Sequence, residues 1–239
     1  MKTELHAHDT RGVSEHGWLS SRFSFSFADY YNQERMNFGA LRVLNDDKIA
    51  AGHGFGMHPH RDMEIISIPL FGELAHKDNI GNELTIGPDE VQVMSAGSGV
   101  VHSEMNPSHE VEGQFLQIWI ETRQKGIPPY HAHGKFPSSE QLNKFVTLVR
   151  PDTVSGQGLS IHQDAYITRG RFTSGIETQY KLQQPNNGVF IFLISGSISI
   201  NGQTLEARDA LAVTKANMID IVSIGEESAD ILVIEVPMI

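Results

Sequence analysis

Short stretches of hydrophobic residues recur along the whole chain, and residues that favour turns separate them. Residues 23–31 (FSFSFADYY) begin with strict alternation, which places Phe23, Phe25 and Phe27 on one face and serines on the other. Residues 63–71 (MEIISIPLF) form a strongly apolar run. Short runs of these two kinds, bounded by turns, are typical of strands. No segment has the period of a long amphipathic helix, so the pattern predicts an all-β barrel or sandwich.

The same texture continues to the end of the chain. Further short strands are predicted over residues 38–44, 84–86, 90–95, 100–106, 115–121, 145–150, 188–194, 197–200, 210–214, 219–224 and 231–236. Asn45-Asp46-Asp47 is predicted to form a turn, and Asn201-Gly202 is the strongest hairpin signal in the chain. Residues 1–22 show little apolar periodicity, and we expect them to form a solvated strand or arm.

One stretch interrupts the repeated strands. Residues 122–141 contain prolines and the element His131-Ala132-His133-Gly134, and they are predicted to form an irregular linker. The chain after this linker repeats the texture of the chain before it, so we predict two similar barrels, residues 1–134 and 135–239. The second half has one histidine after residue 140, His162, and is therefore predicted to lack metal ligands.

Composition excludes several classes of function. Among 239 residues, 18 are Lys or Arg and 29 are Asp or Glu, a net charge of -11 that disfavours binding to nucleic acid or anionic membranes. The chain has no cysteine, so disulfides, thiolate metal sites and cysteine nucleophiles are ruled out. Its first residues lack a secretory hydrophobic region and no apolar run reaches transmembrane length, so we expect a cytoplasmic protein.

Two pairs of potential metal ligands stand out. Gly56-Met57-His58-Pro59-His60 and His102-Ser103-Glu104 each hold two ligands that are separated by one residue. Residues i and i+2 of a strand point to the same face, so neighbouring strands of one barrel would bring His58, His60, His102 and Glu104 together. Three imidazoles and a carboxylate suit one divalent transition metal. Pro59 cannot donate a ladder hydrogen bond, which predicts an edge strand, a bulge or a barrel rim.

The remaining histidines are interpreted more simply. His131 and His133 have the ligand spacing but lie in the predicted linker, which disfavours a metal site there. His76 and His109 lie near predicted turns and are expected to be exposed. His53 and Asn106 are expected to form ordinary hydrogen bonds.

These motifs resemble those of the pirin family, a bicupin group of the cupin superfamily, and especially its bacterial quercetinase-type members. Gly52, His58, His60, Glu64 and Gly72 match the first cupin motif, and Gly87, Gly97, His102 and Asn106 match the second. Ser95 stands where the second motif usually has proline. The runs HGWLSSRFSFSFADYY, HPHRDMEI and SAGSGVVHSEMNP carry the resemblance over about the first half of the chain, and residues 162–164 (HQD) match in the second.

The resemblance implies a bicupin fold of two tandem antiparallel jelly-roll barrels with little helix. It implies that Glu104 is the fourth metal ligand and that Glu64, the ligand of general cupins, has a supporting or structural role. It further implies an iron(II)-dependent quercetin 2,3-dioxygenase that opens a flavonol with O2 and releases carbon monoxide. Glu104 is then the candidate general base. Phe55 and Met57 flank the predicted site, where they either contact the aromatic substrate or serve in packing.

Three points stay open in the sequence. The ligand set also accepts manganese, cobalt, nickel, copper or zinc. A non-catalytic pirin, in which metal state changes a protein-binding surface, is an alternative function. A cupin enzyme that acts on another small molecule is a third.

Overall fold

The structure, a computed structural model, describes residues 1–238, and nearly all of its regular elements are strands. It is built from four sheets, two of seven strands and two of four. The only helical elements of the described residues are two 3-10 turns, η1 (His8–Thr10) and η2 (Ser138–Gln141). None of the described residues forms a helix long and apolar enough to cross a membrane. The all-β prediction is confirmed.

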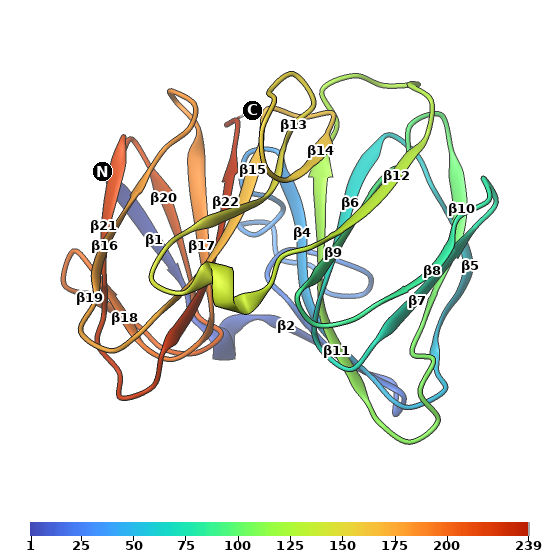
Figure 1. The fold of residues 1–239 in the computed structure, drawn as a ribbon, viewed down its shortest axis with the longest axis horizontal. Coiled ribbons are helices and arrows are strands. Elements are labelled where there is room, and N and C mark those ends of the chain that lie inside the picture. Colours follow the sequence, from blue (N-terminus) through green and yellow to red (C-terminus); the bar gives the residue numbers. More distant parts are fainter. Residues whose placement is uncertain (239) are drawn as a thin grey trace.

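The first barrel pairs a seven-stranded sheet with a four-stranded one (Figure 1). The larger sheet has the order β12-β9-β6-β11-β4-β3-β2, and the smaller has the order β5-β10-β7-β8. The strands are β2 (Gly12–Glu15), β3 (Leu19–Phe23), β4 (Leu41–Ile49), β5 (Gly54–His60), β6 (Met63–Phe71), β7 (Leu74–Asp78), β8 (Glu83–Ile86), β9 (Glu90–Ser95), β10 (Val100–Met105), β11 (Gly113–Glu121) and β12 (Tyr130–Lys135).

The second barrel has the same layout, with sheet orders β1-β20-β17-β22-β15-β13-β14 and β16-β21-β18-β19. Its strands are β1 (Lys2–His6), β13 (Val146–Pro151), β14 (Leu159–Ile161), β15 (Tyr166–Phe172), β16 (Glu177–Lys181), β17 (Gly188–Ser195), β18 (Ile198–Ile200), β19 (Gln203–Leu205), β20 (Ala210–Thr214), β21 (Met218–Ser223) and β22 (Ala229–Val236). Asn201 and Gly202 both have positive φ between β18 and β19, which is the predicted hairpin turn.

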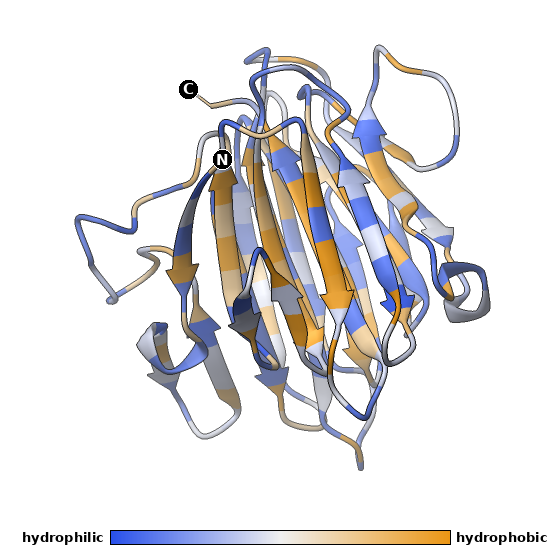
Figure 2. Cartoon of the chain, turned by 90° about the vertical axis from the view of Figure 1, so that its left-hand side faces the viewer, coloured by the Kyte–Doolittle hydropathy of each residue, from blue (hydrophilic) through white to orange (hydrophobic). Residues whose placement is uncertain are grey.

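The two seven-stranded sheets pack face to face, and the largest hydrophobic core lies between them. Side chains alternate along each strand, so β6 sends Ile66 and Ile68 into this core and Ile65 and Ser67 into the first barrel. Figure 2 shows the same alternation of hydrophobic and hydrophilic positions along the strands. The larger sheets are therefore buried on both faces, which explains their nearly continuous apolar runs.

The two barrel interiors differ in chemistry. The second is filled by a core of apolar side chains from both of its sheets, including Phe172, Val189 and Ile191. Its buried carboxylate, Glu235, accepts hydrogen bonds from the Tyr180 hydroxyl and from the backbone amides of Gln183 and Gln184. The first interior instead holds a group of polar side chains beside smaller apolar cores.

The N-terminal segment forms strands, which is one of the two predicted alternatives, and four of the five residues of β1 are exposed. β1 pairs with β20 of the second barrel, whereas β2 and β3 belong to the first. His6 is buried, and its ring lies 5.2 Å from that of Phe190 and 6.1 Å from that of Phe25. In the opposite direction, the carbonyl of Pro237 accepts a hydrogen bond from the Ala40 amide. Each end of the chain thus contacts the barrel built by the other half, and the predicted boundary at residues 134 and 135 stays a prediction.

Three local predictions were wrong. The aromatic strand ends at Phe23, because the chain then turns into a loop where the Ser26 amide donates to the Arg35 carbonyl. Asn45-Asp46-Asp47 lies inside β4 rather than in a turn, because its backbone is paired with β3 on one side and β11 on the other. The predicted linker includes β12, whose backbone pairs with β9.

Candidate metal centre

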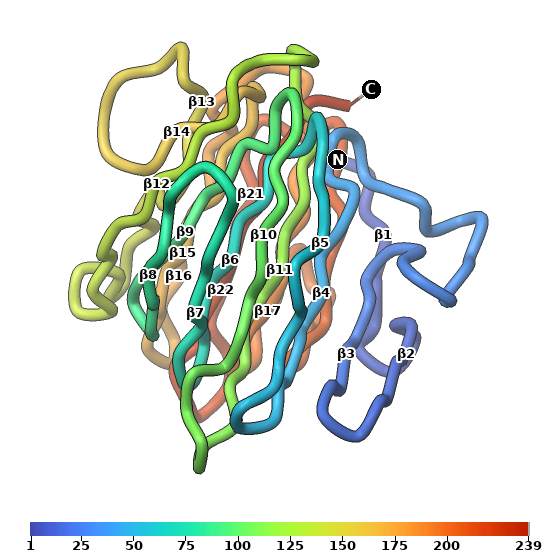
Figure 3. Tube along the Cα trace, turned by 90° about the vertical axis from the view of Figure 1, so that its right-hand side faces the viewer, coloured from blue at the N-terminus to red at the C-terminus, as the bar shows by residue number. Residues whose placement is uncertain are grey.

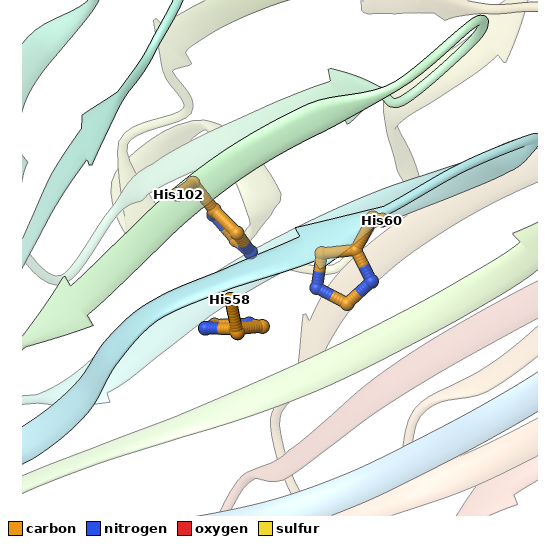
Figure 4. A group of neighbouring side chains, drawn as sticks. All are labelled: His58, His60 and His102. Atoms are coloured by element: carbon orange, nitrogen blue, oxygen red, sulfur yellow. The ribbon is translucent and has the colours of Figure 1, made fainter.

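The two predicted ligand pairs lie on neighbouring antiparallel strands. β5 is the edge strand of its sheet and pairs with β10, so that His58 lies opposite His102 (Figure 3). The position of β5 agrees with the prediction made from Pro59. Figure 4 shows the imidazoles of His58, His60 and His102 projecting to the same side of these strands.

A β-bulge shapes this pairing. His102 is opposite His58 but Glu104 is opposite Phe55, so two residues of β5, Gly56 and Met57, lie opposite the single residue Ser103 of β10. The extra residue shifts the alternation of side chains along β5, so that Phe55 points to the same side as His58. Met57 lies at the bulge, is 56% exposed and is not among the residues that line the pocket, whereas Phe55 is.

The three imidazoles form a compact group. Their ring centroids are 4.5 Å apart for His58 and His102, 4.8 Å for His58 and His60, and 4.9 Å for His60 and His102. One nitrogen from each ring lies within 4.8 Å of the others. The residues present therefore fit a metal ion held by three imidazole nitrogens.

The hydrogen bonds identify the free nitrogens. His58 Nδ1 lies 2.7 Å from the carbonyl oxygen of Gly56, which leaves Nε2 to face the centre of the group. His102 Nε2 is buried without a hydrogen-bond partner among the described residues. A buried nitrogen without a partner costs free energy, and a metal ion would satisfy it.

Burial keeps the imidazoles of His60 and His102 neutral. Desolvation, and then the charge of His58, lowers the pKa of His60 to about 4. Desolvation and the neighbouring histidines also lower the pKa of His102. Metal binding requires the neutral imidazole, so these environments leave both side chains ready to bind at neutral pH.

His76 lies behind His102 and was missed by the sequence analysis, which expected it to be exposed. It is 1% exposed, and its Nδ1 lies 3.4 Å from His102 Nδ1 and 3.3 Å from Gln92 Nε2. Its Nε2 lies 3.2 Å from Asp78 Oδ2. These distances define a series of two hydrogen bonds, in which His102 Nδ1–H donates to His76 Nδ1 and His76 Nε2–H donates to Asp78 Oδ2. Such a series fixes the orientation of a ligand imidazole and raises its basicity.

Asp78 is well suited to end this series of hydrogen bonds. Burial raises its pKa, but hydrogen bonds from Asn82, His76 and Ile80 outweigh burial and lower the pKa overall. An ionised carboxylate is the stronger acceptor for His76. Only the i+2 spacing of His76 and Asp78 on one strand could have indicated the pair in the sequence.

Glu104 lies beside the imidazole group. Its Oε1 accepts a hydrogen bond from the Ser67 hydroxyl at 2.8 Å and its Oε2 accepts one from Gln117 Nε2 at 2.5 Å. A ligand oxygen of Glu104 lies within 4.8 Å of ring nitrogens of both His102 and His76. Each carboxylate oxygen keeps a second lone pair, so these bonds leave room for a metal. Its role as fourth ligand stays a prediction.

Burial also sets the acidity of Glu104. Desolvation raises its pKa, opposed by the hydrogen bond from Ser67 and by the charges of nearby histidines. A carboxylate of raised pKa is a better proton acceptor than a solvated one.

The metal group opens onto a cavity of about 370 Å³. This volume falls in the range of small-molecule sites, about 300–1,000 Å³. Its lining combines five Trp and Phe side chains with several polar ones. The lining includes Trp18, Phe23, Phe27, Phe55 and Trp119, together with Asn45, Asp47, His58, His60, Glu104 and Gln117.

Several polar atoms of this wall have no protein partner. Trp119 Nε1, Asn45 Oδ1 and Asp47 Oδ1 are buried without a hydrogen-bond partner among the described residues. Buried polar groups are normally satisfied, so the three atoms suit a ligand that carries its own donors and acceptors. The Trp119 ring lies 4.8 Å from that of His60, and Asp47 is close enough to Glu104 for the charge of Glu104 to raise its pKa.

Asp47 is a second acidic group of the pocket that the sequence analysis missed. Burial raises its pKa to about 7, opposed by a hydrogen bond from Ser21 and reinforced by Asp46 and Glu104. The sequence placed it in a turn. Its i+2 spacing from Asn45, on a strand flanked by apolar residues, was the available signal.

Glu64 faces away from the metal group. It lies on the same face of β6 as Ile66, toward the second barrel, and accepts a hydrogen bond from the hydroxyl of Ser95, its cross-strand neighbour. Burial raises its pKa. Glu64 is therefore a structural residue between the barrels, and Ser95, which replaces the usual proline, is its partner.

The other sequence candidates lie outside the metal group. His131 is half-buried and stacks on His76 with ring centroids 4.8 Å apart, whereas His133 and His109 are exposed. Asn106 donates to the carbonyls of Ile49 and Val111, which is the ordinary role expected of it. Among residues 1–238, every cluster with metal-ligand geometry lies in the first barrel.

Comparisons with known proteins agree with this description. The pirin family model matches residues 6–120, and the model of the quercetinase C-terminal cupin domain matches residues 148–236. A quercetin 2,3-dioxygenase of Escherichia coli K12 is 37% identical over 229 residues, which cover 95% of each chain. A pirin-like protein of Caulobacter vibrioides is 39% identical, covering 95% of this chain and 96% of its own.

Solved structures show the same fold. The crystal structure of the bacterial pirin YhhW from Escherichia coli in complex with nickel(II) has a TM-score of 0.92 and 35% identity, with both chains fully covered. A quercetin 2,3-dioxygenase from Acinetobacter baumannii shares the fold, with a TM-score of 0.78 at 18% identity. On both sequence and structure, this chain belongs to the pirin family.

Proposed function

We propose that this protein is a metal-dependent quercetin 2,3-dioxygenase, which opens the central ring of a flavonol with O2 and releases carbon monoxide. The observation that carries the proposal is the group of three imidazoles, two of which, His58 and His60, line a cavity of about 370 Å³ with several aromatic residues in its walls. The names of the relatives with 37% identity and more support the choice of reaction.

The site holds one divalent metal through His58, His60 and His102, with Glu104 as the fourth ligand, and we propose iron(II). Three neutral imidazoles accept several first-row metals, so the ligand set favours a divalent metal without selecting iron. When bound, the metal supplies the Lewis acidity that favours an ionised flavonol hydroxyl, and the redox chemistry with O2.

The aromatic walls bind and orient the substrate. Phe55 stands beside His58, with ring centroids 6.4 Å apart, and Trp119 stands beside His60. A flat flavonol fits between such faces, because stacked rings bury a large apolar area. Its hydroxyl groups can meet the unpartnered atoms of Asn45, Asp47 and Trp119.

Glu104 accepts the proton of the substrate hydroxyl. Its carboxylate is fully buried at the floor of the cavity, and burial raises its pKa. Ser67 and Gln117 hold both oxygens in place, so the group is positioned before substrate arrives.

The direct test loads metal-free protein anaerobically with iron, manganese, cobalt, nickel, copper or zinc, one at a time. Quercetin and O2 are then added, and loss of flavonol absorption is followed together with release of carbon monoxide. We expect turnover with at least one redox-active metal. An inert protein with all of iron, manganese, cobalt, nickel and copper contradicts the proposal.

Variants test the roles of single residues. His60→Ala should lose both metal binding and turnover, whereas His109→Ala, which removes an exposed histidine, should keep both. Glu104→Gln preserves the shape of the side chain and should lower kcat by about 10²–10⁴-fold, the usual contribution of a general base. Full turnover in His60→Ala would refute the ligand assignment.

A further inference from the structure

A second cavity lies between the two barrels, away from the metal centre. The chain from η1 to β2 passes between the barrels here (Figure 1), and the turn between β19 and β20 faces the outer surface of β3 and β4. The cavity has a volume of about 330 Å³. Its lining is His8, Arg11, Ser20, Arg22, Asp46, Lys48, Gln114 and Arg208.

The lining carries an excess of positive charge. Four side chains are cationic, Arg11, Arg22, Lys48 and Arg208, and the only carboxylate among the lining residues is Asp46. This concentration contrasts with the net charge of -11 of the whole chain. A partly enclosed cleft of one charge sign attracts ligands of the opposite sign.

Asp46 does not balance the cluster. Its Oδ2 lies 3.3 Å from Arg208 Nη1 and 3.8 Å from Arg11 Nη2, and its Oδ1 accepts a hydrogen bond from Gln114 Nε2 at 2.7 Å. One carboxylate thus serves two guanidinium groups and an amide. Arg22 binds Glu15 at the rim instead, at 2.6 Å.

Arg11 provides an independent sign that an acceptor is missing. The residue is 7% exposed, and its Nε and Nη1 have no hydrogen-bond partner among residues 1–238. The guanidinium carbon lies 5.4 Å above the ring of Phe192, which supports one face of the group but offers no acceptor. Burial lowers the pKa of Arg11. The charge of Asp46 opposes this shift, and the charges of Arg208 and Arg22 reinforce it. Buried guanidinium N–H groups without acceptors are costly, which favours a bound anion.

Lys48 adds a further positive charge to the lining. Its side chain is exposed and it forms no ion pair within the described part of the chain, residues 1–238. His8 also lines the cavity, and its backbone amide and Nδ1 contact Asp209 Oδ1 at 2.7 and 3.1 Å. Asp209 and Glu15 are therefore already bound to residues of the rim.

We propose that this cleft binds a small multivalent oxyanion, such as inorganic phosphate or a short dicarboxylate. Guanidinium groups match the geometry of such anions, because each presents paired N–H donors to two oxygens. Arg11, Arg208 and Lys48 come from three separate segments of the chain, so a bound anion would tie the N-terminal crossing, the first barrel and the second barrel together.

Calorimetric titration of the metal-loaded protein tests this site, with phosphate, succinate and acetate as separate ligands at constant ionic strength. We expect phosphate or succinate to bind and monovalent acetate to bind much more weakly. Phosphate alone would identify a tetrahedral oxyanion site, and succinate alone a dicarboxylate site. The proposal is overturned if neither phosphate nor succinate gives a heat of binding at about 10 mM, since the binding free energy is then weaker than about 3 kcal/mol.

Variants locate the bound anion. Arg208→Gln should weaken binding at least about tenfold, and Lys48→Gln by a smaller factor, because each removes one cation without emptying the core. Lys77→Gln is the matched control, since Lys77 is exposed on β7 and forms an ion pair with Glu83, outside the cleft, and this variant should bind as the original protein does. Arg11→Gln is a further variant whose folding is checked by circular dichroism.

One more variant separates this cleft from the metal centre. His60→Ala removes a proposed metal ligand and should leave anion binding unchanged. Loss of binding in His60→Ala, or unchanged binding in both Arg208→Gln and Lys48→Gln, would assign the anion to another place and refute the proposal. The result is independent of whether the protein turns over quercetin.

Discussion

Single residues decide how the first barrel differs from the second. Both barrels contain a buried carboxylate that meets several donors, Glu104 in the first and Glu235 in the second. Around Glu235 the donors satisfy the charge and the core is apolar. Around Glu104 the neighbours include His102, whose buried Nε2 lacks a hydrogen-bond partner among the described residues, so this interior can take up a ligand that the apolar interior of the second barrel cannot.

Asp47 predicts an unusual dependence of stability on pH. Its folded-state pKa of about 7 lies above the ordinary value of 3.8, so its contribution to stability is fully present below pH 3.8 and is lost as the pH rises through 7. Asp47→Asn removes the buried charge. We compare the unfolding free energy of this variant with that of the original chain, both in metal-free form. The difference, in favour of the variant, should increase by about 2–3 kcal/mol between pH 5 and pH 8.

Urea denaturation at the two pH values measures this difference. Asp29→Asn is the control, because Asp29 is exposed and its replacement should give the same difference at both pH values. A gain for Asp47→Asn that does not change with pH would show that Asp47 is not protonated in the folded protein.

The hydrogen bonds of His76 predict that this residue affects metal affinity without contacting the metal. His76→Phe keeps an aromatic ring but removes both the acceptor for His102 Nδ1–H and the donor to Asp78. Loss of such an outer partner usually weakens metal binding about 10–100-fold. Competition with a chelator gives the affinity, and His133→Phe on exposed β12 is the control. Affinity within about twofold of the original protein would contradict the proposed series of hydrogen bonds.

At the scale of the element, the pairing of β5 with β10 sets the geometry of the metal group. The bulge between Phe55 and His58 turns both side chains into the cavity. Close approach of the two strands depends on Gly54, since a Cβ there would lie 2.3 Å from the Glu104 carbonyl oxygen and 2.6 Å from Met105 Cα. Backbone atoms of a paired strand cannot move aside cheaply.

Gly54→Ala should therefore separate β5 from β10, weaken metal binding and lower stability by about 1–3 kcal/mol, the usual cost of overpacking. Gly56→Ala is a close control two residues away, because a Cβ at Gly56 meets no atom within 4 Å. Thermal unfolding and metal titration of both variants provide the measurement. Equal behaviour of the two variants would show that strand separation does not control the site.

At the scale of the whole molecule, the barrels share a core and exchange chain ends. β1 completes the second barrel, the Pro237 carbonyl binds the Ala40 amide beside the first, and Phe190 of the second contacts Phe25 and Phe38 of the first. Shared burial of this kind couples the two barrels, and we expect them to unfold in one transition.

Phe190→Ala tests the coupling. It removes a large buried side chain from the core between the barrels and should lower the unfolding free energy by about 3–5 kcal/mol. Both tryptophans, Trp18 and Trp119, lie in the first barrel, so their fluorescence reports on that barrel alone. Their transition should shift by the same amount as far-ultraviolet circular dichroism. An unshifted fluorescence transition would show that the barrels unfold independently.

The sequence determined the features that depend on local periodicity. Strand-length apolar runs, the Asn201-Gly202 hairpin and the i+2 spacing of His58 and His60 follow from backbone geometry within a few residues. For the same reason the sequence predicted an all-β fold and an edge strand at Pro59, both of which the structure confirms.

Only the tertiary structure decided which partner each face of a strand meets. Asn45 and Asp47 looked like a turn and His76 looked exposed, because their partners lie on strands far along the chain. Glu64 faces the second barrel rather than the metal because β6 is buried on both sides, which no single strand pattern reveals. The crossing of the chain ends and the cationic cleft arise from packing of the two barrels, and therefore appear only when both are in place.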